Sequence, residues 1–210
     1  MPTIEQARSW YPPADPVHGF EHVLRVLHLA EQIAQAEGAD LEIVRAAALL
    51  HDAAAPAAEA NRQAHHLDSA NFAGQVLAAE GWTEARLAAV VHCIRAHRFR
   101  DRSVQPQSLE AQVLFDADKL DAIGAVGVAR AVAYAARAGQ PAYAAPSRQF
   151  MQGGPPQPGE PHSAYHEYVF KLCKLKDRLY TPTARRLAEA RHRLMADFFE
   201  RLRQEADGCA

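Results

Sequence analysis

Apolar residues recur at helical spacing along most of the chain. In E-H-V-L-R-V-L-H-L-A-E-Q-I-A, residues 21–34, the apolar positions fall three and four residues apart, so one face of a helix is hydrophobic. Gly38 is expected to end this helix, and Asp40 to cap the next, which runs from residue 41 to about residue 54 and stops at Pro56. The pattern therefore predicts two consecutive helices.

Two more amphipathic segments follow. A third helix is expected over residues 68–80, ending at Gly81, with an inner face of Phe72, Val76 and Ala79. Thr83 is expected to cap a fourth helix, whose buried stripe is Leu87, Val90, Val91 and Ile94. On this prediction His65 and His66 lie in the loop before the third helix.

A fifth helix is expected to begin near Leu109, capped by Ser108, and to break or bend near Gly124, because glycine in a helix costs about 1 kcal/mol relative to alanine. Residues 140–162 are rich in proline and glycine, which indicates a mobile loop or active-site flap. Two further helices are expected over residues 163–180 and 183–205.

The whole pattern predicts an all-α fold. No run of alternating β-branched residues and no internal repeat is present. A chain of 210 residues is long enough to bury a sizeable core. We therefore expect one domain, residues 1–210, of about seven or more helices, with a core at residues 18–130 and a C-terminal helical pair, residues 163–206, packed back on it.

Composition narrows the class of protein. A net charge of −2 gives no electrostatic case for binding nucleic acid or an anionic membrane. Three cysteines without paired spacing favour a reducing compartment. No signal-peptide pattern is visible, and no apolar run approaches the roughly 18 residues of a membrane helix. These features predict a cytoplasmic protein. Histidine is abundant, with eight of eleven between residues 18 and 97.

The pair His51-Asp52 stands out, because it interrupts the otherwise apolar run A-A-A-L-L-H-D-A-A-A. Neighbouring residues on a helix point about 100° apart, so both side chains reach one ion only near the end or edge of the helix. Borderline metals accept imidazole and carboxylate together. His22 on the preceding helix and Asp118 in D-A-D-K-L-D are candidates for the remaining ligands, whereas a polar kink at a helix end is the simpler alternative.

With these motifs the sequence resembles the HD superfamily of metal-dependent phosphohydrolases, and within it a bacterial subgroup of small single-domain proteins. The matching segments are H-V-L-R-V, L-L-H-D, H-C-I-R-A-H-R-F, F-D-A-D-K-L-D-A-I-G-A-V-G-V-A-R and H-E-Y-V-F-K-L-C-K-L-K-D-R-L-Y-T. The resemblance implies an HD-type helical bundle. It also implies that His22, His51, Asp52 and Asp118 bind a divalent metal ion: Mn, Ni, Co, Fe or Mg.

Two positions depart from the family pattern. Relatives usually carry H-S-F-S where this chain has H-R-F-R, and the two arginines either contact phosphate or face solvent. HD enzymes often place an acidic residue within about a turn of the H-D pair, whereas here A-A-A-P-A-A precedes the first acid, Glu59. The second departure puts a dedicated acidic catalyst in doubt.

Further roles follow from position. Asp121, one turn after Asp118, is a candidate general base or a group that orients a ligand. His97, His92 and Lys119 are further candidates for catalysis or for supporting the ligands; either histidine alternatively completes a second metal position.

Phosphate contacts are expected from Lys171 and Lys174, which share a helix face, and from Arg25. Arg25, one turn after His22, alternatively pairs with a carboxylate that supports the metal ligands. A solvated surface is the alternative for the two lysines. His18, four residues before His22, is a candidate for substrate contact, for support of His22, or for a helix cap.

The leading hypothesis is a phosphohydrolase that uses metal-activated water to cleave a phosphate ester or anhydride of a small molecule. We expect the substrate to be a nucleotide, and the activity to be that of a nucleoside triphosphate pyrophosphohydrolase or of a nucleotidase. The alternative is a helical module that senses a nucleotide or metal without turnover. An oligomer is possible.

Overall fold

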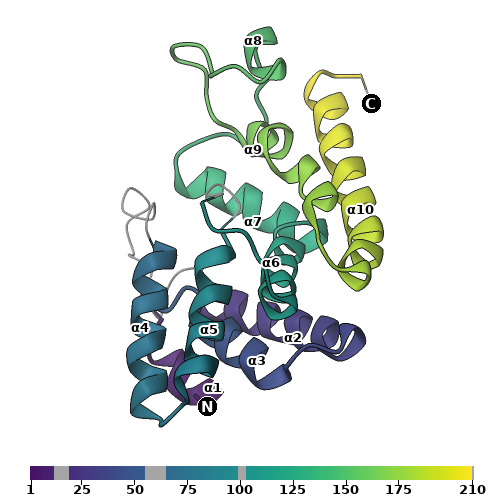
Figure 1. Cartoon of the computed structure of the whole chain (residues 1–210). Helices are drawn as coiled ribbons and strands as arrows, with labels where there is room; N and C mark the ends of the chain where they lie inside the picture. Colours follow the sequence, from purple (N-terminus) through teal and green to yellow (C-terminus); the bar gives the residue numbers. More distant parts are fainter. Residues whose placement is uncertain (12–18, 55–64, 99–102, 210) are drawn as a thin grey trace. The chain divides into compact units, whose positions relative to one another are not determined.

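The computed structural model describes residues 1–11, 19–54, 65–98 and 103–209, and every regular element among them is helical (Figure 1). The all-α prediction is confirmed. The α-helices are α1 (Ile4–Arg8), α2 (Phe20–Glu37), α3 (Leu41–Leu50), α4 (His65–Ala79), α5 (Glu84–Ala96), α6 (Leu109–Asp121), α7 (Gly124–Arg137), α8 (Arg148–Met151), α9 (Ala164–Phe170) and α10 (Pro182–Ala206). Two short 3-10 helices, η2 (Leu172–Lys174) and η3 (Lys176–Arg178), precede α10. None of the described helices is both long and apolar enough to cross a membrane.

The chain forms two compact units. Unit 1 comprises Met1–Asp118 and Leu179–Ala184, and unit 2 comprises Lys119–Arg178 and Arg185–Ala210. The boundaries fall inside α6 and α10, so each of these helices begins in unit 1 and continues into unit 2. The residues of the H-D pair and Asp118 belong to unit 1.

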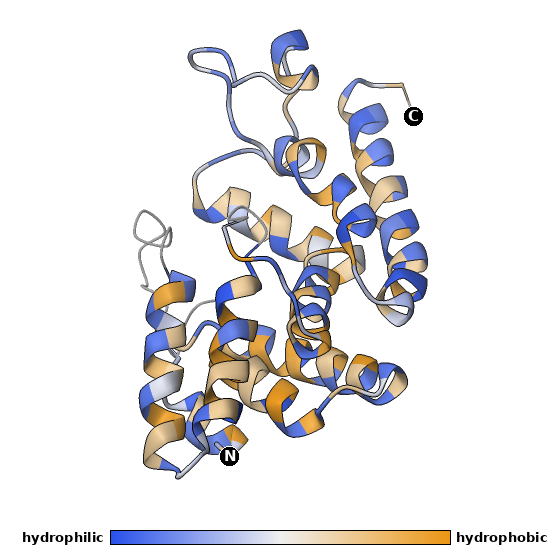
Figure 2. Cartoon of the chain, in the orientation of Figure 1, coloured by the Kyte–Doolittle hydropathy of each residue, from blue (hydrophilic) through white to orange (hydrophobic). Residues whose placement is uncertain are grey.

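Unit 1 is built around α3. Helix α3 packs against α2 and α5, and α5 lies beside α4 (Figure 1). Hydrophobic residues are concentrated on α2 and α3 (Figure 2). Ala46, Ala47 and Ala48 are fully buried, and their small side chains allow neighbouring helices to approach closely.

The predicted caps around α3 are present. Gly38 ends α2 in a left-handed conformation with φ of 80°. The carboxylate of Asp40 accepts the backbone N–H groups of Glu42 and Ile43. Arg86 on α5 donates to both Asp40 and Glu42 and so joins α5 to the start of α3.

Two boundaries in unit 1 were predicted wrongly. Helix α3 ends at Leu50 rather than near residue 54, and residues 51–54 form a turn closed by the N–H of Ala53 on the carbonyl of Leu50. Pro56, the predicted stop, lies outside the described residues. Helix α4 begins at His65, so His65 and His66 are helical rather than in a loop.

The predicted inner face of α4 was also wrong. Ala70, Ala73 and Leu77 are buried, whereas Phe72 and Val76 are half-buried and Ala79 is exposed. Phe72 instead contacts Trp10, at 5.4 Å between ring centroids. The buried face of α4 is thus formed by two alanines and Leu77, while Phe72 and Val76 lie at its edge.

In unit 2 the predicted break near Gly124 is confirmed, because α7 begins there with φ of 79°. A Cβ on Gly127 would lie 2.3 Å from the carbonyl oxygen of Ala122, so only glycine fits this turn. The single helix expected over residues 163–180 was wrong. Ser163 does cap α9, but α9 ends at Phe170 and the chain continues through η2 and η3.

The segment of residues 140–162 contains α8 and is held by Glu160. The carboxylate of Glu160 accepts the N–H of Ser147 at 2.7 Å and the N–H of Gln157 at 2.6 Å. It also pairs with Nε2 of buried His166 at 3.0 Å, and Nδ1 of His166 contacts the hydroxyl of Ser163. These contacts attach the segment to the start of α9.

Candidate metal centre

The H-D pair lies immediately after α3, where both side chains can reach one site. The ring of His51 is fixed by Nδ1, which lies 2.8 Å from the carbonyl oxygen of Ala48 and donates its hydrogen there. In the neutral ring Nε2 then carries the lone pair, and this atom lies 3.3 Å from Nε2 of His22 on α2. Both histidines are buried.

This arrangement suits a cation. Two imidazole nitrogens lie only 3.3 Å apart, so in the tautomers that leave both Nε2 atoms unprotonated they can share a metal ion. His22, His51 and Asp52 each offer a ligand atom, and the three atoms lie within 4.8 Å of one another. Asp118 approaches from α6, with Oδ1 3.5 Å from Nε2 of His22. The gathered donor set is thus two imidazoles and one carboxylate, which fits a divalent metal ion, and the carboxylate of Asp118 lies beside it against His22.

Asp52 also belongs to a second group, with His65 and His97. Oδ1 of Asp52 lies 3.2 Å from Nε2 of His65 and 3.8 Å from Nε2 of His97. The Nδ1 of His97 lies 2.6 Å from the carbonyl oxygen of Ile94, so its Nε2 is turned toward Asp52. The two groups share one carboxylate.

Asp52 is held in its ionised form. Burial opposes ionisation, but the neighbouring imidazoles of His51, His65 and His97 outweigh it and hold the pKa of Asp52 well below its ordinary value. A metal ligand must be deprotonated to bind, so this environment prepares the carboxylate for a cation.

Tyr11 fixes the end of α3 from the other side. Its hydroxyl donates to the carbonyl oxygen of Leu49 at 2.9 Å. Burial, together with the charge of Asp52, raises the pKa of Tyr11 well above its ordinary value, so the hydroxyl remains a donor.

His65 is the residue at this site that the sequence pattern did not single out. Its placement depends on α4 beginning three residues earlier than the apolar periodicity indicates, which puts His65 in the first turn. The polar pair His65-His66 carries no periodic signal of its own. Its contacts with Asp52 and with the ring of His97, at 5.7 Å between ring centroids, distinguish His65 from a surface histidine.

The remaining catalytic candidates, Asp121, Lys119 and His92, are not members of the two groups that share Asp52. Asp121 is buried and pairs with Arg130, at 2.7 Å between Oδ2 and Nη1. Lys119 is buried and belongs to unit 2. His92 accepts the N–H of Gln107 and is not among the described residues gathered around Asp52.

The candidate phosphate-binding residues are also placed. Arg25 is half-buried on α2, one turn after His22. In unit 2, Lys171 pairs with Glu167 at 3.4 Å. Lys174 donates to the carbonyl of Phe170 and lies 5.9 Å from the centre of its ring. His18 lies outside the described residues.

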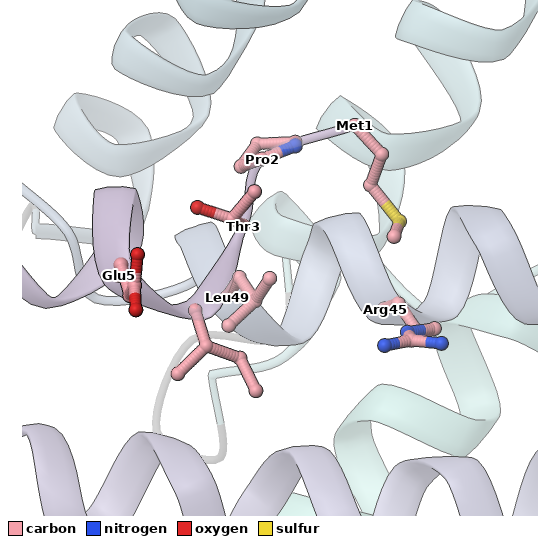
Figure 3. Close-up of a pocket in the computed structure, with 7 residues that line it drawn as sticks. Met1, Pro2, Thr3, Glu5, Arg45 and Leu49 are labelled. Carbon is pink, nitrogen blue, oxygen red and sulfur yellow. The ribbon is translucent and has the colours of Figure 1, made fainter.

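A separate open pocket of about 390 Å³ lies where the N-terminal segment meets α3 (Figure 3). It is lined by Met1, Pro2, Thr3, Ile4, Glu5, Arg45 and Leu49. Only one carboxylate, from Glu5, lines it, so it lacks the ligand set gathered around Asp52.

Comparison with known proteins decides the family. The model of the HD domain family matches residues 19–123, which include all four candidate ligands. The chain belongs to the HD domain family. This membership confirms the predicted class, a metal-dependent hydrolase of the HD superfamily.

Relatives cover nearly the whole chain. YpgQ from Bacillus subtilis (strain 168) is 36% identical over 214 residues, 97% of this chain and 94% of YpgQ. The crystal structure of YpgQ in complex with ADP matches with a TM-score of 0.75 and 33% identity, covering 99% of this chain and all of that one. An HD-superfamily hydrolase from Bacillus thuringiensis matches with a TM-score of 0.71 and 28% identity, covering 97% and 94% of the two chains.

Proposed function

We propose that this HD protein is a metal-dependent phosphohydrolase that cleaves a phosphate ester or anhydride of a nucleotide, with His22, His51, Asp52 and Asp118 as the metal ligands. The observation that carries the proposal is the convergence of two buried imidazole nitrogens, 3.3 Å apart, beside two carboxylates. A divalent cation bound by such a set lowers the pKa of a coordinated water and neutralises charge on a phosphoryl oxygen.

The chain's own groups prepare this chemistry. Ala48 accepts the Nδ1 hydrogen of His51, which keeps Nε2 available as a ligand atom. Ile94 accepts the Nδ1 hydrogen of His97 in the same way, so Nε2 of His97 is the atom that gives or takes a proton. His97 is therefore the better placed of the two histidines on its segment to protonate a leaving group, because His92 is engaged by Gln107.

A nucleotide substrate is supported by the relative YpgQ, whose structure contains ADP. Phosphate oxygens require cationic or N–H donors, and Arg25, Lys171 and Lys174 are the candidates. Lys171 is paired with Glu167, which offsets its charge, whereas Lys174 is exposed and contacts the backbone carbonyl and the ring of Phe170. Lys174 is therefore the stronger of the two lysines for substrate contact.

The test is turnover by the purified protein. The chain, supplied with Mn²⁺ or Co²⁺, is screened against nucleoside mono-, di- and triphosphates, and phosphate and pyrophosphate are measured separately. Release of pyrophosphate from triphosphates identifies a pyrophosphohydrolase, and release of phosphate from monophosphates identifies a nucleotidase. Asp52→Asn is the matched control, because it keeps the size of the side chain. Metal binding without any turnover across the panel contradicts the proposal.

A binding module that senses nucleotides is the second candidate, favoured by one observation. The two described residues after Asp52 are Ala53 and Ala54, so the turn that follows the pair carries no acid. Calorimetry distinguishes the two functions. A nucleotide that raises the thermal midpoint and is recovered chemically intact after prolonged incubation with metal favours the sensor.

A further inference from the structure

Asp116, the first acid of F-D-A-D-K-L-D, lies two residues before the candidate ligand Asp118 on α6. It is fully buried and accepts three donors from the segment that begins α10. These are the N–H of Tyr180 at 2.9 Å, the N–H of Thr181 at 2.7 Å and the hydroxyl of Thr181 at 2.8 Å. All of these residues belong to unit 1.

The same segment is bound by a second carboxylate. Glu37, the last residue of α2, accepts the N–H of Thr183 at 2.7 Å. Thr181 accepts the N–H of Ala184 and so caps α10, whose first residue, Pro182, has no N–H to satisfy. The start of α10 therefore joins the two helices that carry His22 and Asp118, through one carboxylate on each. Negative charge is favourable at this end of a helix.

The position of Asp116 on α6 gives it a specific effect. Two residues along a helix correspond to a turn of about 200°, so Asp116 and Asp118 lie on nearly opposite sides of α6. Anchoring Asp116 to the backbone of Tyr180 and Thr181 thus sets the rotation of α6 about its axis. A carboxylate oxygen about 6 Å from that axis moves by about 1 Å for each 10° of rotation, which is enough to spoil a ligand position.

We propose that Asp116 is a positioning residue of the metal centre: by fixing the rotation of α6 on the start of α10, it holds Asp118 toward His22. This inference rests on the proposed metal ligands. It assigns to Asp116 a role that does not require contact with the metal or with substrate.

The experiment measures Co²⁺ affinity and the visible absorption of bound Co²⁺ in the full-length chain. Asp116→Asn keeps the size of the side chain but turns an amide N–H₂ toward backbone donors. It is expected to raise the Kd for Co²⁺ about tenfold and to change the absorption spectrum, because groups that orient a ligand typically contribute 10- to 100-fold to metal affinity. Glu37→Ala is the matched control, since it releases the same start of α10 from the far end of α2. It is expected to lower the thermal midpoint while the Kd and the spectrum stay as in the wild type.

A wild-type Kd and spectrum in Asp116→Asn would overturn the inference. So would an equal change in Glu37→Ala, because the effect would then come from general loosening. If Asp116→Asn does not fold, Thr181→Val removes only the hydroxyl donor and the cap; about a threefold rise in Kd is expected, and an unchanged Kd overturns the inference. Failure of the wild-type chain to bind Co²⁺ is a different result, which removes the metal centre itself and this role with it.

Discussion

Replacing Asp121 with asparagine tests whether this acid acts in the reaction or in the fold. Asp121 is 1% exposed, and its Oδ2 lies 2.7 Å from Nη1 of Arg130, whose side chain is 17% exposed. Arg191 interacts electrostatically with the same carboxylate, and it also donates to the carbonyl oxygen of Leu120 at 2.6 Å. The charge of Asp121 therefore compensates two partly buried guanidinium groups.

The size of the effect follows from that burial. Removing one partner of a fully buried ion pair costs about 3–5 kcal/mol, because the other charge is left uncompensated. Arg130 keeps some contact with water, and asparagine keeps one acceptor, so we expect a loss of about 2 kcal/mol for Asp121→Asn. For a chain of 210 residues this corresponds to a fall of about 4–5 °C in the thermal midpoint.

Calorimetry and urea titration measure this loss, and a double variant controls for it. Asp121→Asn combined with Arg130→Gln leaves two neutral groups that can hydrogen bond, so it should lose less stability than the two single variants added together. At temperatures where Asp121→Asn is folded, Co²⁺ affinity should match that of the wild type. A variant that melts like the wild type but has lost turnover would refute this reasoning and assign Asp121 to the reaction as a general base.

Further predictions concern the metal, the substrate, acid stability and the thiols. His51→Ala should bind no metal in elemental analysis, since one of two facing imidazoles is lost; one tightly held ion per chain would disprove the ligand set. Lys174→Ala should raise KM severalfold with little change in kcat in steady-state kinetics, whereas an unchanged KM returns this lysine to the solvated surface. Glu160 accepts two backbone N–H groups, which lower its pKa from 4.5 to about 2. A folded-state pKa below the unfolded value gives stability that is present above about pH 4.5 and lost as the pH falls toward 2. Pepsin should therefore cut residues 140–162 faster over that range, and the cleavage rate should depend less on pH in Glu160→Gln. Burial raises the pKa of Cys93 to about 12, so a thiol reagent should label exposed Cys209 and leave Cys93 unmodified until the chain unfolds.

The sequence predicts helices well where each cap is local. Asp40, Ser108 and Ser163 cap their helices as predicted, because a cap depends only on the next few residues. The break at Gly124 was predictable for the same reason, although the clash that requires Gly127 involves a carbonyl five residues away. Thr83 does precede α5, but the prediction that its side chain caps this helix was wrong, since it makes no capping hydrogen bond.

What the sequence could not predict depends on contacts between distant segments. The buried face of α4 consists of Ala70, Ala73 and Leu77, whereas the larger Phe72 suggested a different side of the helix. The candidate ligands His22, His51 and Asp118 were found because each lies in a recognisable motif. His65 lies in no recognisable motif. It becomes a candidate site residue because the fold brings the start of α4 to Asp52. The motif F-D-A-D-K-L-D does not distinguish Asp116 from its other acids. The contact with Thr181, which indicates its role, exists only in the folded chain.

The path of the chain through α6 and α10 has a consequence for how the protein is made. Unit 1 includes Leu179–Ala184, so its last six residues leave the ribosome only after all of residues 119–178. Until then Asp116 is without the three donors from Tyr180 and Thr181, and the end of α2 is without Thr183. The stretch matched by the family, residues 19–123, therefore gains these contacts only after residues 180–183 have been made. His51 and Asp52 are translated early, whereas Tyr180 and Thr181, which bind Asp116 beside Asp118 on α6, are translated late.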